Sequence, residues 1–144
     1  MIEGLGDMSL SLAFAAIGSA FGTGFAGMAA VGAWKKAFSQ NKAAPFILVA
    51  FVGAPLSQTI YGMILRNAIQ AANLPPESYP YQMVLGMAAG LAMGASAYMQ
   101  GKAGAKAADA LADTGKGFGN DIMVLGVIET VALFVMVFTM TALP

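Results

Sequence analysis

The chain has 144 residues, of which 58% are hydrophobic and 10% are charged, and its mean hydropathy is +0.73. A composition this apolar and this poor in charge excludes an ordinary water-soluble domain and indicates an integral membrane protein. The net charge of zero gives no reason to expect nucleic acid as a partner, and without cysteine or histidine the chain has no disulfide, thiolate metal site or histidine acid–base chemistry.

Four long stretches with almost no charge predict four transmembrane helices. They cover residues 8–34, 43–65, 78–101 and 122–144. Each supplies the ~20 residues that a helix rising ~1.5 Å per residue needs to cross ~30 Å of hydrocarbon. We therefore expect an all-α membrane protein. Charged residues at spacings of three and four follow the third stretch and predict a solvated continuation of its helix: Lys102, Lys106, Asp109 and Asp113.

The basic residues predict the orientation of the chain in the cell membrane. Lysines lie in the connector between the first two stretches and in the connector between the last two, whereas Arg66 is the only basic residue between the second and third. Because positively charged loops stay in the cytoplasm, we expect both hairpin loops there and both termini outside.

The stretches pair into two hairpins of similar composition, at residues 1–72 and 73–144. The first and third stretches contain small residues at every fourth position, as at Gly18/Gly22 and Gly86/Gly90/Gly94, which lets helices approach closely in lipid. The second and fourth stretches carry bulky apolar residues that suit lipid contact. A duplicated, wedge-shaped unit of this kind predicts a ring of identical subunits.

Glu129 is the only charged residue between Ile122 and Pro144. An ionised side chain in hydrocarbon costs from about 3 to more than 10 kcal/mol, so such a residue is retained mainly for an ion pathway. In the duplicated unit, Gln58-Thr59 corresponds to Glu129-Thr130. The first hairpin therefore carries an amide where the second carries the acid, and the four helices hold one titratable site.

The two hairpins are predicted to bring polar groups to one depth. Folding the second hairpin at residues 113–116 places Gln100 level with Glu129, because both arms rise equally per residue. Folding the first at residues 38–39 places Ser19 level with Gln58. Pro55 lacks an N–H group and should leave a nearby main-chain carbonyl, around Ala54 or residue 51, without its usual donor.

This expected layer consists of oxygen groups, namely the carboxylate of Glu129, the amides of Gln58 and Gln100, the hydroxyls of Ser57, Thr59, Tyr61 and Thr130, and the freed carbonyl. Neutral oxygens around one carboxylate favour a small hard cation, and a single negative charge neutralises Na⁺. A proton is the alternative, with Gln100 and Tyr61 hydrogen-bonding a neutral acid.

Four segments carry a resemblance to a known family: residues 55–62 (PLSQTIYG), 98–102 (YMQGK), 127–130 (VIET) and 17–20 (IGSA). With them, nearly the whole chain resembles the proteolipid rotor subunit of V-type ATPases. It is most similar to the four-helix subunit of bacterial sodium-pumping enzymes.

The resemblance implies a non-catalytic subunit of a membrane ring, turned by a central stalk against an a-type stator subunit that carries an arginine. It implies Glu129 as the ion carboxylate, Gln58, Gln100 and Ser57 as Na⁺ ligands, and the carbonyl of Ala54 as a further ligand. We expect Tyr61 and Thr130 to support the carboxylate.

A small ion-coupled secondary transporter, with Glu129 as its proton-exchange site, is the main alternative. Its substrate pocket would need aromatic residues facing the acid. Trp34, Tyr79 and Tyr81 instead lie in or near the connectors of the predicted hairpins.

Overall fold

The computed structural model describes residues 4–144, so the first three residues of the expected first hairpin lie outside the described part. Within that part the chain is all-helical, and four helices are long and apolar enough to cross a membrane. The helical elements are α1 (Leu10–Ser39), η1 (Phe46–Leu48), α2 (Val49–Gly53), η2 (Ala54–Leu56), α3 (Ser57–Ala71), η3 (Pro76–Ser78), α4 (Tyr79–Thr114) and α5 (Phe118–Thr141). The prediction of an all-α protein with four transmembrane helices is confirmed.

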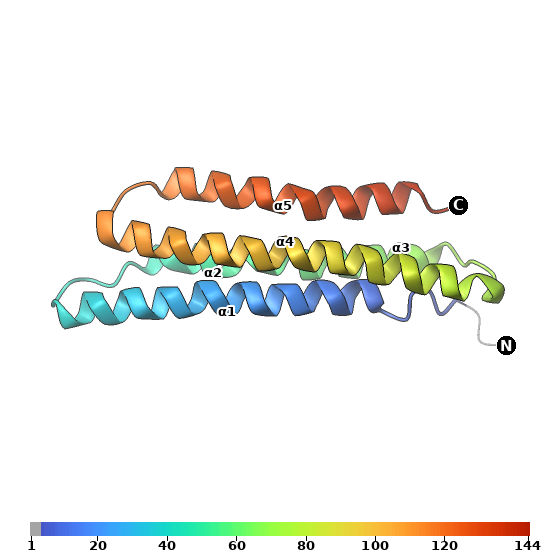
Figure 1. The fold of residues 1–144 in the computed structure, drawn as a ribbon, viewed down its shortest axis with the longest axis horizontal. Coiled ribbons are helices and arrows are strands. Elements are labelled where there is room, and N and C mark those ends of the chain that lie inside the picture. The colour runs from blue at the N-terminus through green and yellow to red at the C-terminus, as the bar shows by residue number, and fades with distance from the viewer. Residues whose placement is uncertain (1–3) are drawn as a thin grey trace.

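The helices run as two hairpins (Figure 1). Helix α1 is antiparallel to the α2–α3 span, and α4 is antiparallel to α5. Both hairpin loops lie at one end of the bundle, whereas the start of α1, the α3–α4 connector and the end of α5 lie at the other (Figure 1). The lysine distribution likewise requires both hairpin loops at one end and both termini at the other. The side of the membrane on which each end lies stays a prediction.

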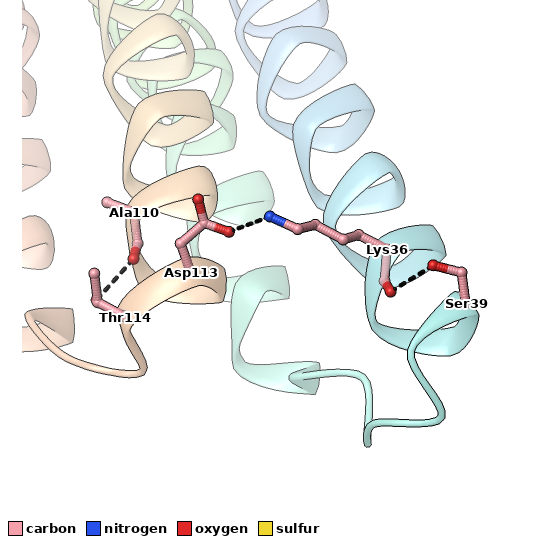
Figure 2. Close-up of polar contacts among 5 residues, drawn as sticks. All are labelled: Lys36, Ser39, Ala110, Asp113 and Thr114. Carbon is pink, nitrogen blue, oxygen red and sulfur yellow. Dashed lines mark hydrogen bonds and ion pairs between the residues drawn. The ribbon is translucent and has the colours of Figure 1, made fainter.

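Helix α4 continues well beyond residue 101, where the apolar stretch ends. Its last turns carry the four predicted solvated residues, Lys102, Lys106, Asp109 and Asp113, and all four are exposed. At this end Lys36 Nζ of α1 donates to Asp113 Oδ1 of α4 at 2.7 Å, and Figure 2 shows the two side chains reaching toward one another.

The second span is interrupted at Pro55. The α-helix gives way to the short 3₁₀ turn η2 between α2 and α3, because proline has no N–H group for the helical ladder. The carbonyl oxygen of Ala54 accepts hydrogen bonds from the N–H group of Ser57 and, at 3.1 Å, from its hydroxyl. The proline thus creates an irregular turn directly before Gln58, but the prediction of a carbonyl without a donor is wrong for Ala54, because Ser57 supplies two.

Helices α1 and α4 run parallel and pack with their backbones in contact. A Cβ atom added to Gly18 would overlap the main chain of Gly94, and one added to Gly101 would overlap that of Gly22. Bulky side chains are exposed on α3 and α5, such as Ile60 and Phe134, and also on α1 and α4, such as Phe21 and Leu91. The predicted close packing of the two small-residue helices is therefore present, whereas exposed bulky side chains are not confined to the other two.

The interior is divided into two apolar clusters. Leu48, Phe51 and Leu125 belong to the cluster near the hairpin loops, and Leu65 and Met93 belong to the cluster near the chain ends. Along α5, Leu125 and Ala132 belong to different clusters and flank Glu129. The buried polar side chains Gln58, Gln100, Ser96 and Ser19 lie at the depth between them.

Candidate ion-binding site

Glu129 of α5 lies between two hydrogen-bond donors. The hydroxyl of Tyr61 on α3 donates to Glu129 Oε1 at 2.7 Å, and the amide of Gln100 on α4 donates from Nε2 to Oε2 at 3.2 Å. Gln100 Nε2 also donates to the main-chain carbonyl of Leu125 at 3.0 Å. Gln100 and Glu129 are therefore at one level, as the hairpin geometry predicts, and each carboxylate oxygen has a donor.

Two glutamine side chains continue this network into the protein. Gln58 Nε2 donates to Gln100 Oε1 at 2.9 Å, and both side chains are completely buried. The polar groups of a buried amide must find partners inside the protein, since unmet hydrogen bonds there are costly. The pair joins the amide of the first hairpin to the acid of the second through α4.

Ser57 brings further oxygen atoms to Gln58. Its hydroxyl lies 3.1 Å from the carbonyl oxygen of Ala54 and 3.2 Å from Gln58 Oε1. The single hydroxyl hydrogen can serve only one of these oxygens at a time. Gln58 Oε1, Ser57 Oγ and Ala54 O thus form a cluster of oxygens that shares this one hydroxyl hydrogen, and Ala54 O also accepts from the Ser57 N–H group.

Thr130 does not reach the carboxylate. Its hydroxyl donates at 2.7 Å to the carbonyl of Val127 in its own helix, and the residue is exposed. Successive helical residues point about 100° apart, so a side chain next to Glu129 faces another direction. The prediction that Thr130 supports the acid is therefore wrong, whereas Tyr61 does contact it.

Ser19 is buried on α1 at the depth of Gln58. Helices α1 and α3 meet at Ala15 and Gly62, where a Cβ atom added to Gly62 would contact Ala15 Cβ. This contact lies one helical turn away from the level of Ser19 and Gln58. The Ser19 hydroxyl is 2% exposed and has no hydrogen-bond partner among the described residues. The predicted level is correct, but Ser19 does not join the network.

Ser96 belongs to the network and was not predicted from the sequence. Its hydroxyl donates to the main-chain carbonyl of Ile128 at 2.8 Å and lies 3.5 Å from Gln58 Nε2. It precedes Gln100 by four residues and so shares its face of α4. This spacing was available in the sequence, but a serine in a transmembrane helix is an ordinary observation.

The site consists of oxygen atoms that can ligate a cation, grouped around one acid. Within residues 4–144 no group of three or more histidine, cysteine, aspartate or glutamate side chains gathers to hold a metal. One carboxylate together with neutral amide, hydroxyl and carbonyl oxygens is a set of ligands that suits an alkali cation. These atoms come from α3, α4, α5 and the turn at Pro55.

The second hairpin carries the feature that connects the chain to known proteins. Residues 83–142 match the C-subunit family of ATP synthases. The matched segment contains Ser96, Gln100 and Glu129. Members of this proteolipid family are non-catalytic membrane proteins that translocate ions in a rotor, and the match supports that role for this multi-pass chain. No curated protein matches the chain.

Proposed function

We propose that the protein is the rotor-ring subunit of a V-type rotary ATPase and carries one Na⁺ per subunit at Glu129. The observation that supports this most directly is the pair of donors on the carboxylate, with a cluster of neutral oxygens beside them. The ligands would be Glu129, Gln58, Gln100, Ser57 and the Ala54 carbonyl, and Tyr61 would hold the carboxylate.

The oxygen cluster beside Glu129 favours sodium over a proton. Tyr61 Oη can donate to an ionised carboxylate or accept from a protonated one, so a proton would need no group beyond this contact. A cation instead needs several oxygen ligands in place of its water shell, and Gln58 Oε1, Ser57 Oγ and Ala54 O lie together beside the acid network. One negative charge at Glu129 would be cancelled by one Na⁺.

Cancellation of this charge is what would allow rotation. Glu129 bare in hydrocarbon would cost several kcal/mol, whereas Glu129 with bound Na⁺ presents a neutral site to the lipid. Each member of the homo-oligomeric ring would take an ion from a channel in the stator subunit, where an arginine displaces it, and a central stalk driven by ATP would turn the ring.

The single acid favours the V-type assignment and a pump. The first hairpin has Gln58 where the second has Glu129, so a ring of these subunits carries half as many ions as one with an acid in each hairpin. Fewer ions per turn means more energy from ATP for each ion. Hairpin loops facing the cytoplasm would place the Lys36–Asp113 end toward the stalk.

Replacement of Glu129 by glutamine in the intact complex tests the proposal. We expect Na⁺ transport and its coupling to ATP hydrolysis to be lost, while Glu77→Gln, the same change in the exposed α3–α4 connector, leaves both intact. Coupled transport that survives Glu129→Gln would contradict the proposed role.

The ion is tested by carbodiimide labelling of Glu129 with NaCl or KCl at constant ionic strength. Protection by NaCl alone is expected, whereas labelling that responds only to pH would favour protons. The detergent-solubilised mass separates a ring from a transporter, since a ring is many times the 14.7 kDa of one chain.

A further inference from the structure

Ser96 connects the backbone of α5 to the ligand cluster of the proposed site. It is 7% exposed, and its hydroxyl donates at 2.8 Å to the carbonyl of Ile128, the residue before Glu129. A main-chain carbonyl oxygen can only accept a hydrogen bond. The single hydroxyl hydrogen of Ser96 is therefore committed to α5.

The hydrogen bond from Ser96 to Ile128 determines how Ser96 can interact with Gln58. With its hydrogen used, Ser96 Oγ can only accept toward the amide of Gln58, whose Nε2 lies 3.5 Å away. The same Nε2 donates its other hydrogen to Gln100 Oε1 at 2.9 Å. Both hydrogens of the Gln58 amide thus point toward α4.

The carbonyl oxygen of Gln58 must then point the other way. Gln58 Oε1 lies on the side of the Ser57 hydroxyl, 3.2 Å from it, in the cluster that contains the Ala54 carbonyl. If the amide turned over, Oε1 would face the lone pairs of Ser96 Oγ and Gln100 Oε1. Such a reversal is unfavourable as long as Ser96 donates to Ile128.

We propose that Ser96 is a positioning residue that holds the carbonyl oxygen of Gln58 toward the bound cation and thereby sets the affinity of the site for sodium. This inference rests on the proposed function. Ser96 itself does not touch the ion. Without its hydroxyl the Gln58 amide loses one acceptor, and its oxygen spends part of the time turned away from the cluster.

The test uses ATP hydrolysis by the intact membrane complex as a function of Na⁺ at constant ionic strength. In Ser96→Ala we expect the half-saturating Na⁺ concentration to rise about twofold, because the Ser96–Gln58 hydrogen bond is long, at 3.5 Å, and a weak hydrogen bond worth ~0.5 kcal/mol corresponds to that factor. The maximal rate at saturating Na⁺ should stay that of the wild type, since Glu129, Tyr61 and Gln100 are unchanged.

Two variants separate positioning from a general loss of packing. Ser96→Thr keeps a hydroxyl and should restore the wild-type Na⁺ midpoint. Ser11→Ala removes another buried serine hydroxyl, which donates from α1 to the Gly62 carbonyl at 3.3 Å, and should leave the midpoint unchanged.

The outcomes distinguish the two proposals. A wild-type complex whose hydrolysis does not respond to Na⁺ would overturn the sodium assignment itself. A sodium-dependent wild type with an unchanged midpoint in Ser96→Ala would overturn only the role of Ser96. An equal shift of the Na⁺ midpoint in Ser11→Ala would also overturn the role of Ser96. So would a Ser96→Thr ring that has wild-type thermal stability but a Na⁺ midpoint as high as that of Ser96→Ala.

Discussion

Tyr61 and Glu129 lie on different hairpins and share a hydrogen bond of 2.7 Å between the phenol hydroxyl and the carboxylate. Both residues are only partly buried, so the bond lies near the surface of the four-helix unit. The proposed ion site is therefore assembled only when the two hairpins pack against each other. Variants that affect this contact should separate ion binding from stability.

Tyr61→Phe removes the hydroxyl and keeps the ring. We expect the Na⁺ concentration that half-protects Glu129 from carbodiimide to rise about tenfold or more, because hydrogen bonds to charged groups contribute ~1.5–3 kcal/mol. Tyr98→Phe is the matched control, since the Tyr98 ring contacts Phe21 and Phe25 edge-on and lies away from the acid. A wild-type midpoint in Tyr61→Phe would mean that the hydroxyl is dispensable.

Gln100→Leu should abolish Na⁺ protection and also lower the stability of the ring. It leaves the Gln58 amide, the Leu125 carbonyl and Glu129 Oε2 without the partner they have now. Each buried polar group left unpaired costs about 1–3 kcal/mol. Thermal unfolding of the ring and the labelling assay measure the two effects.

Gln82→Leu is the control for this variant, because Gln82 is also buried but hydrogen-bonds Ser78 near the α3–α4 connector. It should lower thermal stability and keep the wild-type Na⁺ midpoint. Equal loss of protection in both variants would indicate that Gln100 acts through stability alone.

Gly18→Ala tests the close packing of α1 and α4. The added methyl group would overlap the Gly94 backbone, which cannot move aside like a flexible side chain. Overpacking of this kind costs about 1–3 kcal/mol or more, so we expect less assembled ring and a lower unfolding temperature. Gly32→Ala in the same helix, where an added Cβ meets no atom within 4 Å, should behave as the wild type. Normal assembly of Gly18→Ala would show that the helices can separate without loss.

The Lys36–Asp113 ion pair should contribute little to stability despite its 2.7 Å length. Both side chains are well exposed, at 59% and 61%, and water and salt screen such pairs. Lys36→Ala is expected to leave the unfolding temperature of the ring unchanged at physiological salt. A clearly lower unfolding temperature in Lys36→Ala, matched by an equal decrease of the wild-type unfolding temperature at high salt, would contradict this expectation.

The amino-acid sequence by itself determined the four spans, the two hairpins and the depth of the site. Long uncharged stretches have few alternatives to membrane helices, and one rise per residue places Gln100 level with Glu129 without further information. The same reasoning placed Gln58 and Tyr61 in the polar network, because polar groups in an apolar span are few and distinct, whereas it did not show that Ser57 supplies donors to the Ala54 carbonyl.

Only the tertiary structure decided which polar groups at that depth meet. The rotation of each helix about its axis follows from packing, such as the contact of Gly18 with Gly94, and it turns Thr130 outward while it brings Ser96 to α5. The direction of each hydrogen bond follows from fixed acceptors, the carbonyls of Leu125 and Ile128. Residue spacing along the chain sets height in the membrane, but it contains no information about these orientations.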